Sequence, residues 1–376
     1  MRLNRMGKVA VLDKPKGNFQ IQKYPVPDPA PATLVLRIEL CGVCGTDIHI
    51  YHGYLSGIPF PLILGHEITG KIIALGKGVE NDFLGKPVGI GDRIVLLPAI
   101  YCGKCYFCIV AKTPTKCPNA VQYGFFPNPD QKPYFTGGYA EYLYLHNPNT
   151  VFFKTSAPAE VAVFIEPSAM AVHAVDRAKI EIGDTVVVQG SGTLGLLTLV
   201  YAKLAGAAQT IVIGKRRKER LKIARELGAD LTINMEEIPD KEERIRIVKE
   251  RSYTGYGADV VFECSGALPA VSEGLQYLRD SATFCEVGTF VDMGSVDINP
   301  ALDIVGKNIT VEGVYDNGTE QFVKALPILE KGEIPFFKMI SHKLPLERLK
   351  EAMTEREIDN KEITKIVVAP GSGEDS

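Results

Sequence analysis

Short apolar stretches separated by turns make up roughly the first 165 residues of the chain. Glycine, proline, asparagine and aspartate divide stretches that are rich in β-branched and aliphatic side chains, which is the pattern of β-strands joined by turns. The expected strands are Lys8–Leu12, Thr33–Leu40, Ile68–Leu75 and Asp92–Leu97. Short strands at this spacing are typical of an antiparallel barrel or sandwich.

The pattern changes between about residue 168 and residue 312, where continuous apolar runs alternate with amphipathic stretches. The expected buried strands are Thr185–Val188, Thr210–Ile213, Asp259–Phe262 and Ala282–Cys285. A helical pattern such as Glu219–Leu227, which Gly228 would end, lies between them. Apolar strands that alternate with helices predict a parallel sheet covered on both faces. We therefore expect an α/β protein with a separate β-rich domain.

The segment after about residue 315 carries two helical patterns, near Glu320–Lys331 and Leu346–Glu355, and an apolar strand at Ile366–Val368. Because the α/β region already has enough strands for a complete sheet, we expect this segment to return to the first domain. The predicted boundaries are 1–167 for the first domain, 168–314 for the α/β domain and 315–376 for the returning segment.

Composition narrows the class of protein. A chain of 376 residues has room for two domains. The formal net charge is -3 and the basic residues are scattered except at Lys215–Lys218, which argues against nucleic acid as a partner. The start of the chain is not followed by an uncharged apolar run, and the longest apolar stretch is interrupted by Lys203. We expect a cytoplasmic protein without a membrane or nucleic-acid partner.

A glycine-rich turn follows the first strand of the α/β region. Gly190, Gly192 and Gly195 lie between the strand that ends at Gln189 and a predicted helix. Glycines in this arrangement allow a tight turn and let a pyrophosphate approach the backbone, while the start of the helix supplies N–H donors. This context predicts a dinucleotide-binding site.

The end of the next strand bears on the choice of coenzyme. An NAD site usually places a carboxylate there, whereas this chain has Lys215, Arg216 and Arg217. Cations at this position favour the 2′-phosphate of NADP over NAD. The alternative is that these residues are simply the solvated start of the following helix.

Four cysteines form the most specific local pattern in the chain. Cys102, Cys105, Cys108 and Cys117 lie in a loop that contains glycine and proline. Four thiolates can surround one zinc ion with no open position, which is the arrangement of a structural site. An iron–sulfur cluster and four unliganded thiols are the alternatives.

A second set of metal-ligand residues lies earlier in the chain. Cys44, His66 and Glu67 offer a thiolate, an imidazole and a carboxylate, the ligand types that zinc accepts. These residues alone leave open a simpler interpretation, in which Cys44 and His66 pack inside the core.

With both cysteine sets and the glycine turn in this order, the chain resembles the zinc-dependent medium-chain alcohol and polyol dehydrogenases along nearly its whole length. The matching motifs are Cys44–Asp47, Gly65–Glu67, Cys102–Cys117 and Gly190–Gly195. Glu166 falls where the family has its third catalytic ligand, and the pair Glu166-Pro167 resembles the sorbitol and polyol branch. The spacing between Cys108 and Cys117 is one residue longer than is usual in the family.

The resemblance implies a GroES-like β-barrel catalytic domain, a Rossmann coenzyme domain with a doubly wound parallel sheet, and a homo-oligomer, dimeric or tetrameric. It implies a catalytic zinc ion held by Cys44, His66 and Glu166, with Glu67 exchanging with water, beside the structural zinc ion. The substrate would be a small alcohol or ketone. Hydride would pass between it and NADP or NAD.

The resemblance also implies roles for three residues close to the first ligand. Thr46 and His49 would relay a proton to solvent, and Asp47 would orient a ligating imidazole. Thr46 could instead be an ordinary turn residue and His49 a surface histidine.

Two other functions compete with this interpretation. A zinc-free quinone or enone reductase of the same superfamily is disfavoured because Cys44, His66 and Glu166 occur together. A non-enzymatic zinc-binding regulatory module could contain the four-cysteine loop, but the chain lacks a basic region of the kind that binds nucleic acid.

Overall fold

A computed structural model describes residues 3–126, 132, 134–215, 218–354 and 363–371. The chain divides into two compact units, of which unit 1 comprises Met1–Glu166 and Gly318–Ser376, and unit 2 comprises Pro167–Asn317. Each unit contains its own cluster of buried apolar side chains. The predicted α/β fold class with a separate β-rich domain is confirmed.

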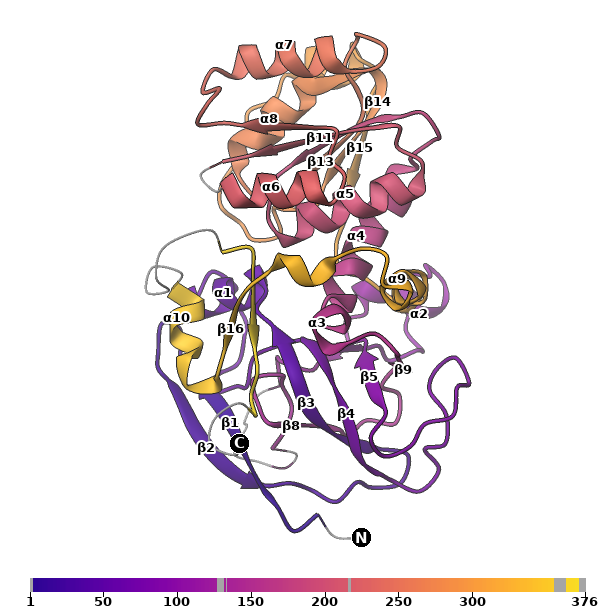
Figure 1. The fold of residues 1–376 in the computed structure, drawn as a ribbon, viewed down its shortest axis with the longest axis vertical. Coiled ribbons are helices and arrows are strands. Elements are labelled where there is room, and N and C mark those ends of the chain that lie inside the picture. The colour runs from indigo at the N-terminus through magenta and orange to yellow at the C-terminus, as the bar shows by residue number, and fades with distance from the viewer. Residues whose placement is uncertain (1–2, 127–131, 133, 216–217, 355–362, 372–376) are drawn as a thin grey trace. The chain divides into compact units, whose positions relative to one another are not determined.

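Unit 1 is built on a mainly antiparallel sheet (Figure 1). The strands of unit 1 are β1 (Met6–Leu12), β2 (Phe19–Pro25), β3 (Leu34–Gly42), β4 (Glu67–Leu75), β5 (Arg93–Leu96), β6 (Ala99–Ile100), β7 (Val121–Gln122), β8 (Tyr142–Leu145), β9 (Phe152–Lys154), β16 (Ile340–Leu344) and β17 (Lys365–Val368). The main sheet has the order β16-β17-β3-β4-β5-β9, and β8 also pairs with β3. Strand β3 is therefore the centre of the unit, with its partners on both sides.

Two connections bring distant parts of the sequence onto this sheet. The hairpin of β1 and β2 is a separate two-stranded sheet, and isolated bridges link Val9 to Ala140, just before β8, and Leu12 to Leu62, in the segment before β4. Strand β17, near the end of the chain, pairs antiparallel with the end of β3, with Val367 opposite Gly42. The segment after residue 318 thus shares a sheet with the amino-terminal strands.

Short helices connect the strands of unit 1. The helical segments are α1 (Gly45–His52), α2 (Tyr106–Ile109), α3 (Ala159–Ala162), α9 (Thr319–Lys331) and α10 (Leu349–Thr354), with 3₁₀ turns at Pro114–Lys116, Phe336–Met339 and Leu346–Arg348. The helix α4 (Ile165–Ala178) begins at the end of unit 1 and continues into unit 2. Helix α9 matches the predicted helix near Glu320–Lys331.

Unit 2 contains a six-stranded parallel sheet. Its strands are β10 (Thr185–Gln189), β11 (Gln209–Gly214), β12 (Leu231–Asn234), β13 (Ala258–Glu263), β14 (Leu278–Glu286) and β15 (Thr310–Gly313). The spatial order is β12-β11-β10-β13-β14-β15, so the sheet grows outward in both directions from the pair β10 and β13. This is the order of a Rossmann sheet, in which the direction of winding reverses between the first and fourth strands.

Helices cover both faces of this parallel sheet (Figure 1). Helices α5 (Thr193–Ala205) and α6 (Lys218–Glu226) lie on one face, and α7 (Lys241–Arg251) and α8 (Leu268–Tyr277) lie on the other. A π-helical turn at Pro300–Val305 precedes β15. Because both faces are covered, the central strands consist of buried apolar residues, as the sequence pattern predicts.

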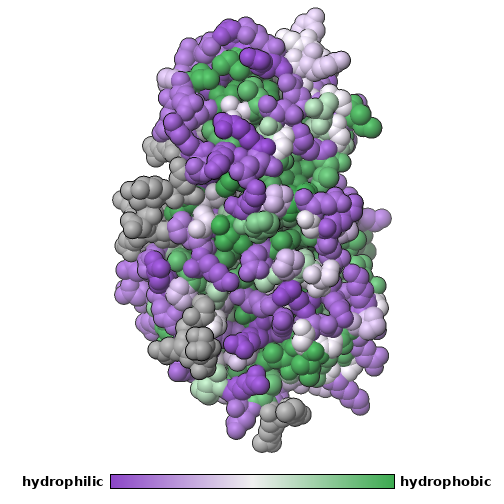
Figure 2. Space-filling view, in the orientation of Figure 1, coloured by the Kyte–Doolittle hydropathy of each residue, from purple (hydrophilic) through white to green (hydrophobic). Residues whose placement is uncertain are grey.

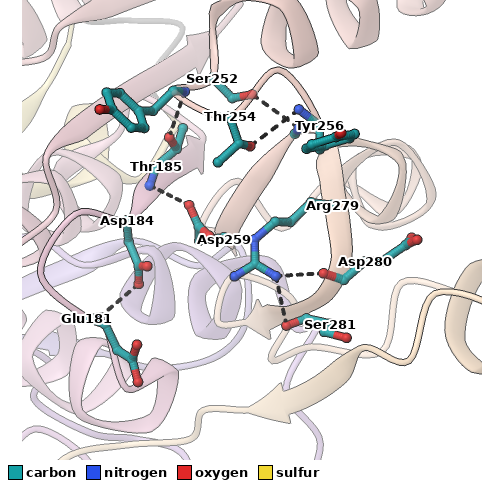
Figure 3. A network of polar contacts seen from close by, with 12 residues as sticks. Glu181, Asp184, Thr185, Ser252, Thr254, Tyr256, Asp259, Arg279, Asp280 and Ser281 are labelled. Atoms are coloured by element: carbon teal, nitrogen blue, oxygen red, sulfur yellow. Dashed lines mark hydrogen bonds and ion pairs between the residues drawn. The ribbon is translucent and has the colours of Figure 1, made fainter.

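Polar contacts join the amino ends of three strands in unit 2 (Figure 3). The Asp259 carboxylate of β13 accepts a hydrogen bond from the Thr185 backbone N–H of β10 at 2.7 Å and one from the Arg279 side chain of β14 at 2.6 Å. Arg279 also donates to the backbone carbonyls of Asp280 and Ser281. These contacts fix the relative positions of β10, β13 and β14 at their amino ends, which lie opposite the end of the sheet that carries the glycine-rich turn.

The sequence pattern did not identify β12 and β15, which are the two edge strands of this sheet. Strand β15 is largely exposed, with Val311 at 51% exposure. An edge strand is defined by hydrogen bonds along one side and does not require an apolar run.

On the face shown in Figure 2, hydrophilic residues dominate and hydrophobic residues form separate patches. Among the described residues, no helix combines the length and the apolar character needed to cross a bilayer.

Candidate metal and coenzyme sites

The first candidate site begins where β3 ends and α1 starts. Cys44 is the residue before α1, and its backbone N–H donates to the Asp47 carboxylate at 3.0 Å. This contact satisfies an N–H at the start of the helix and draws Asp47 back toward Cys44. The Cys44 thiol lies 3.6 Å from the Thr46 hydroxyl oxygen. The turn thus places a thiol, a hydroxyl and a carboxylate within a few residues of one another.

Strand pairing brings the second part of the site to this turn. Strand β4 starts at Glu67 and pairs antiparallel with β3, so Glu67 lies opposite Gly42. As a result, ligand atoms of Cys44, His66 and Glu67 all lie within 4.8 Å of one another. His66 and Glu67 are buried, at 4% and 1% exposure. A thiolate, an imidazole and a carboxylate at this separation form a donor set that suits zinc.

Asp47 supports the His66 ring from behind. Its Oδ1 lies 3.5 Å from His66 Nδ1, and its Oδ2 accepts a hydrogen bond from the Tyr139 hydroxyl at 2.8 Å. Burial, the largest single cause, would raise the pKa of Asp47, but His66, the Cys44 N–H and the Tyr139 hydroxyl together lower it. A carboxylate on one ring nitrogen fixes the orientation of an imidazole. With Nδ1 facing Asp47, Nε2 is the nitrogen left to bind a metal ion.

A buried lysine neutralises Glu67. The Lys365 ammonium of β17 contacts Glu67 Oε2 and donates to the Val43 carbonyl at 3.0 Å. Lys365 is only 3% exposed. The sequence motifs do not predict this residue as part of the site. A single lysine within the otherwise apolar run of β17 was the available signal, because a charge in such a run requires a partner.

Glu166 and His49 are also predicted to belong to this site. Glu166 occupies the first turn of α4 and is half-buried. It is not one of the three residues whose ligand atoms lie within 4.8 Å. Burial would lower the pKa of Lys365, but chiefly Glu67, and to a smaller extent Glu166, raise it. His49 lies on α1. Its pKa is lowered, mainly by burial and to a smaller extent by the nearby charge of His52.

The four-cysteine loop forms a compact cluster. The sulfur atoms of Cys102, Cys105, Cys108 and Cys117 lie within 4.8 Å of one another. The Cys105 sulfur is 3.5 Å from that of Cys108 and 3.8 Å from that of Cys117. The antiparallel pair β6 and β7 joins the two ends of the loop. The Lys104 backbone N–H, the largest influence, lowers the pKa of the Cys102 thiol to about 6, whereas burial and the neighbouring thiols raise the pKa of Cys108 to about 12, so that without a metal ion the cluster favours ionisation at Cys102 only.

The glycine-rich turn occupies the junction of β10 and α5. Gly190 has a positive φ of 105°, and a Cβ atom there would lie 2.9 Å from the Ser265 backbone nitrogen. A Cβ atom on Gly195 would lie 1.9 Å from the Gly190 carbonyl oxygen. A side chain at Gly190 would therefore clash with the turn after β13, and one at Gly195 would clash with the backbone at the start of the glycine-rich turn. The close packing places the turn at the switch point of the sheet, where ligands of this fold bind.

The predicted coenzyme-selecting residues follow β11. Lys215 is exposed directly after this strand. Arg216 and Arg217 lie outside the described residues. Lys218, the first residue of α6, forms an ion pair with Glu237 at 3.1 Å.

Comparison with known protein families matches both units. The alcohol dehydrogenase GroES-like domain matches residues 30–155, and the zinc-binding dehydrogenase family matches residues 193–331. The chain is 33% identical to 5-exo-hydroxycamphor dehydrogenase of Pseudomonas putida, over 88% of this chain and 90% of that protein. It is 31% identical to sorbitol dehydrogenase of Halalkalibacterium halodurans, over 94% and 96% of the two chains.

Solved structures agree with these matches. An alcohol dehydrogenase from Thermotoga maritima superposes with a TM-score of 0.89 at 32% identity, covering 97% of this chain and 100% of that one. A zinc-binding dehydrogenase from Sinorhizobium meliloti, solved with NADP, superposes with a TM-score of 0.83 at 28% identity over the same shares.

Proposed function

Since the chain belongs to the zinc-dependent medium-chain alcohol and polyol dehydrogenases, we propose that it catalyses reversible hydride transfer between a secondary alcohol or polyol and NADP or NAD, with NADP favoured. The chain is an oxidoreductase of the alcohol dehydrogenase type. The observation that carries the proposal is the buried donor set of Cys44, His66 and Glu67, with Asp47 behind the imidazole. The relatives named above act on 5-exo-hydroxycamphor and on sorbitol.

The catalytic zinc ion would be held by Cys44 and His66, with Glu67 and Glu166 as the carboxylate ligands. The chemistry that zinc supplies in such a site is that of a Lewis acid, which lowers the pKa of a bound hydroxyl group. Asp47 holds the His66 ring in place, and Lys365 balances the charge of Glu67. The structural zinc ion would be held by Cys102, Cys105, Cys108 and Cys117.

The proton released by the alcohol would leave through Thr46 and His49. Both residues lie on α1, the helix that follows Cys44. Thr46 is close to the first ligand, and His49 has a lowered pKa, so that its ring is neutral and able to accept a proton near pH 7.

We also propose a homo-oligomer, either a dimer or a tetramer. The edge strand β15 of unit 2 is largely exposed, and Leu302 and Val305 in the preceding turn are 69% and 75% exposed. An exposed strand edge flanked by apolar side chains is suited to pairing with a second copy.

The first test is a screen of secondary alcohols, polyols, aldoses and threonine with both coenzymes. Metal content and molecular mass are measured on the same preparation. We expect turnover of an alcohol, about two zinc ions per chain and a mass above that of the monomer. Turnover of quinones or enones without zinc would identify the chain as a reductase instead. Material without zinc or coenzyme binding would contradict the proposed function.

The role of Glu166 is tested by Glu166→Ala. Because Glu166 would supply a ligand to the catalytic zinc ion, we expect loss of most activity and about one zinc ion fewer per chain. Glu160→Ala is the matched control, since Glu160 lies one helix earlier, with its side chain 48% exposed, and pairs with Lys343. Unchanged zinc content and turnover in Glu166→Ala would remove Glu166 from the site.

The proton path is tested by His49→Gln. During alcohol oxidation His49 must accept a proton, so activity should fall as the pH drops through its lowered pKa. The variant should lose roughly 10- to 100-fold in kcat and lose this pH dependence. His52→Gln, on the same helix, should keep the rate and the pH dependence, with the midpoint moved to higher pH because the charge of His52 no longer lowers the pKa of His49. An unaltered rate and pH profile in His49→Gln would exclude His49 from the path.

Coenzyme choice is tested by the double variant Arg216→Ala, Arg217→Ala. If these cations bind the 2′-phosphate, KM for NADP should rise about tenfold or more while KM for NAD changes less than about twofold. Lys222→Ala is the matched control, because Lys222 is an exposed cation on α6 that pairs with Glu219. Equal effects on both coenzymes would refute the NADP assignment.

A further inference from the structure

A phenylalanine ring lies against the imidazole of the candidate metal ligand His66. The ring centroids of Phe125 and His66 are 5.5 Å apart, and the ring planes are inclined to each other at 33°. His66 is buried, whereas Phe125 packs on the core of unit 1 and is only half-buried. The donor set therefore has an aromatic neighbour that is not fully enclosed in the core.

Close packing of two glycines brings Phe125 to this position. Gly65, the residue before His66, has a φ of 92°, and Gly124, the residue before Phe125, has a φ of 94°. A Cβ atom on Gly124 would lie 2.7 Å from the Gly65 carbonyl oxygen. The two turns can approach this closely because Gly124 has no side chain, and the positive φ favours glycine at both positions. The backbone that carries Phe125 is thus packed directly on the backbone that carries His66.

The next residue along the chain, Phe126, contacts a different set of rings. Its ring centroid lies 5.1 Å from that of His146 and 5.6 Å from that of Tyr123. Tyr123 is fully buried, so this contact attaches the segment to the core of unit 1. Two adjacent residues of the same type therefore have different surroundings, and only Phe125 contacts a candidate metal ligand.

Buried polar side chains next to the donor set already have partners. Asp47 contacts His66 and accepts a hydrogen bond from the Tyr139 hydroxyl, and Glu67 contacts Lys365. These groups hold the ligands in place, so they are not available to bind additional hydroxyl groups of a substrate. The neighbour of His66 that is available to a substrate is a phenyl ring.

Resting on the proposed dehydrogenase function, we propose that Phe125 is a specificity-determining residue, which selects a secondary alcohol with a hydrocarbon body, such as an alicyclic alcohol, over an open-chain polyol. A substrate at the ion that His66 would bind lies next to Phe125, because the phenyl ring packs on the imidazole itself. The carbon skeleton of the alcohol is then the part of the substrate that meets the ring.

The selection follows from the surface that the ring presents. Hydrocarbon placed against the phenyl ring removes apolar surface from water on both sides, which stabilises the complex. A polyol has a hydroxyl group on every carbon, and hydroxyl groups placed against the ring give up hydrogen bonds to water without gaining new ones. The ring thus strengthens binding of one class of alcohol and weakens binding of the other. The packing of Gly124 on Gly65 keeps the ring in place.

The test measures kcat and KM for cyclohexanol and for D-sorbitol with the wild-type holoenzyme and with Phe125→Ala. We expect the wild-type enzyme to have the higher kcat/KM for cyclohexanol. Phe125→Ala should lower this value about 10- to 100-fold, chiefly through KM, because the apolar contact exists before and during the reaction. The kcat/KM for D-sorbitol should not fall. Phe125→Leu keeps an apolar side chain and should restore most of the lost kcat/KM for cyclohexanol.

Phe126→Ala is the matched control. Phe126 is the same residue type and is also half-buried, but its ring packs on Tyr123 and His146 instead of His66. This variant should leave the ratio of the two kcat/KM values unchanged. Zinc content is measured for every variant and should be the same in Phe125→Ala as in the wild-type enzyme, which separates a lost substrate contact from a lost ion.

Four results would overturn the proposal. They are a wild-type preference for D-sorbitol, comparable losses for both alcohols in Phe125→Ala, the same change of ratio in Phe126→Ala, and a loss of zinc that accounts for the effect of Phe125→Ala. In each case the wild-type enzyme still oxidises an alcohol. These results therefore differ from failure of the proposed function, in which the wild-type enzyme oxidises no alcohol with either coenzyme.

Discussion

The contact between Glu67 and Lys365 is the interaction on which unit 1 most depends. Both groups are almost fully buried, so each would impose a large desolvation cost without the other. Glu67 starts β4 and Lys365 starts β17, and these strands flank the two sides of β3. One ion pair therefore connects β17 to the start of β4, where Glu67 lies next to His66.

The same principle organises the rest of the donor set. Asp47 is buried but faces His66 and accepts a hydrogen bond from Tyr139, so its charge is compensated on two sides. The carboxylates of Glu67 and Asp47 thus lie beside Cys44 and His66, and each carboxylate already has its own partner in the structure. A site held in this way needs little rearrangement when an ion binds, because its ligands are oriented by neighbours that are themselves buried.

The carboxylates of unit 2 differ from one another in the partners that compensate their charge. Glu273 is paired with Arg244 by two hydrogen bonds, at 2.7 and 2.8 Å, and Asp259 is paired with Arg279. Glu263 and Glu286, at the carboxyl ends of β13 and β14, accept hydrogen bonds from backbone and hydroxyl donors and form no ion pair with the described lysines and arginines. The first two carboxylates are therefore balanced by arginines, and the other two by hydrogen-bond donors.

The sequence by itself determined the α/β class, the central strands of both sheets, the glycine-rich turn and the residue types that could bind metal. These features are local, because strand periodicity, turn residues and ligand spacing are all contained in short segments. Only the tertiary structure decided that β12 and β15 complete the parallel sheet, that Cys44 lies beside His66 and Glu67 while Glu166 lies farther away, and that Lys365 neutralises Glu67. Those facts depend on pairing between distant strands, and no local pattern specifies which buried charge will meet which partner.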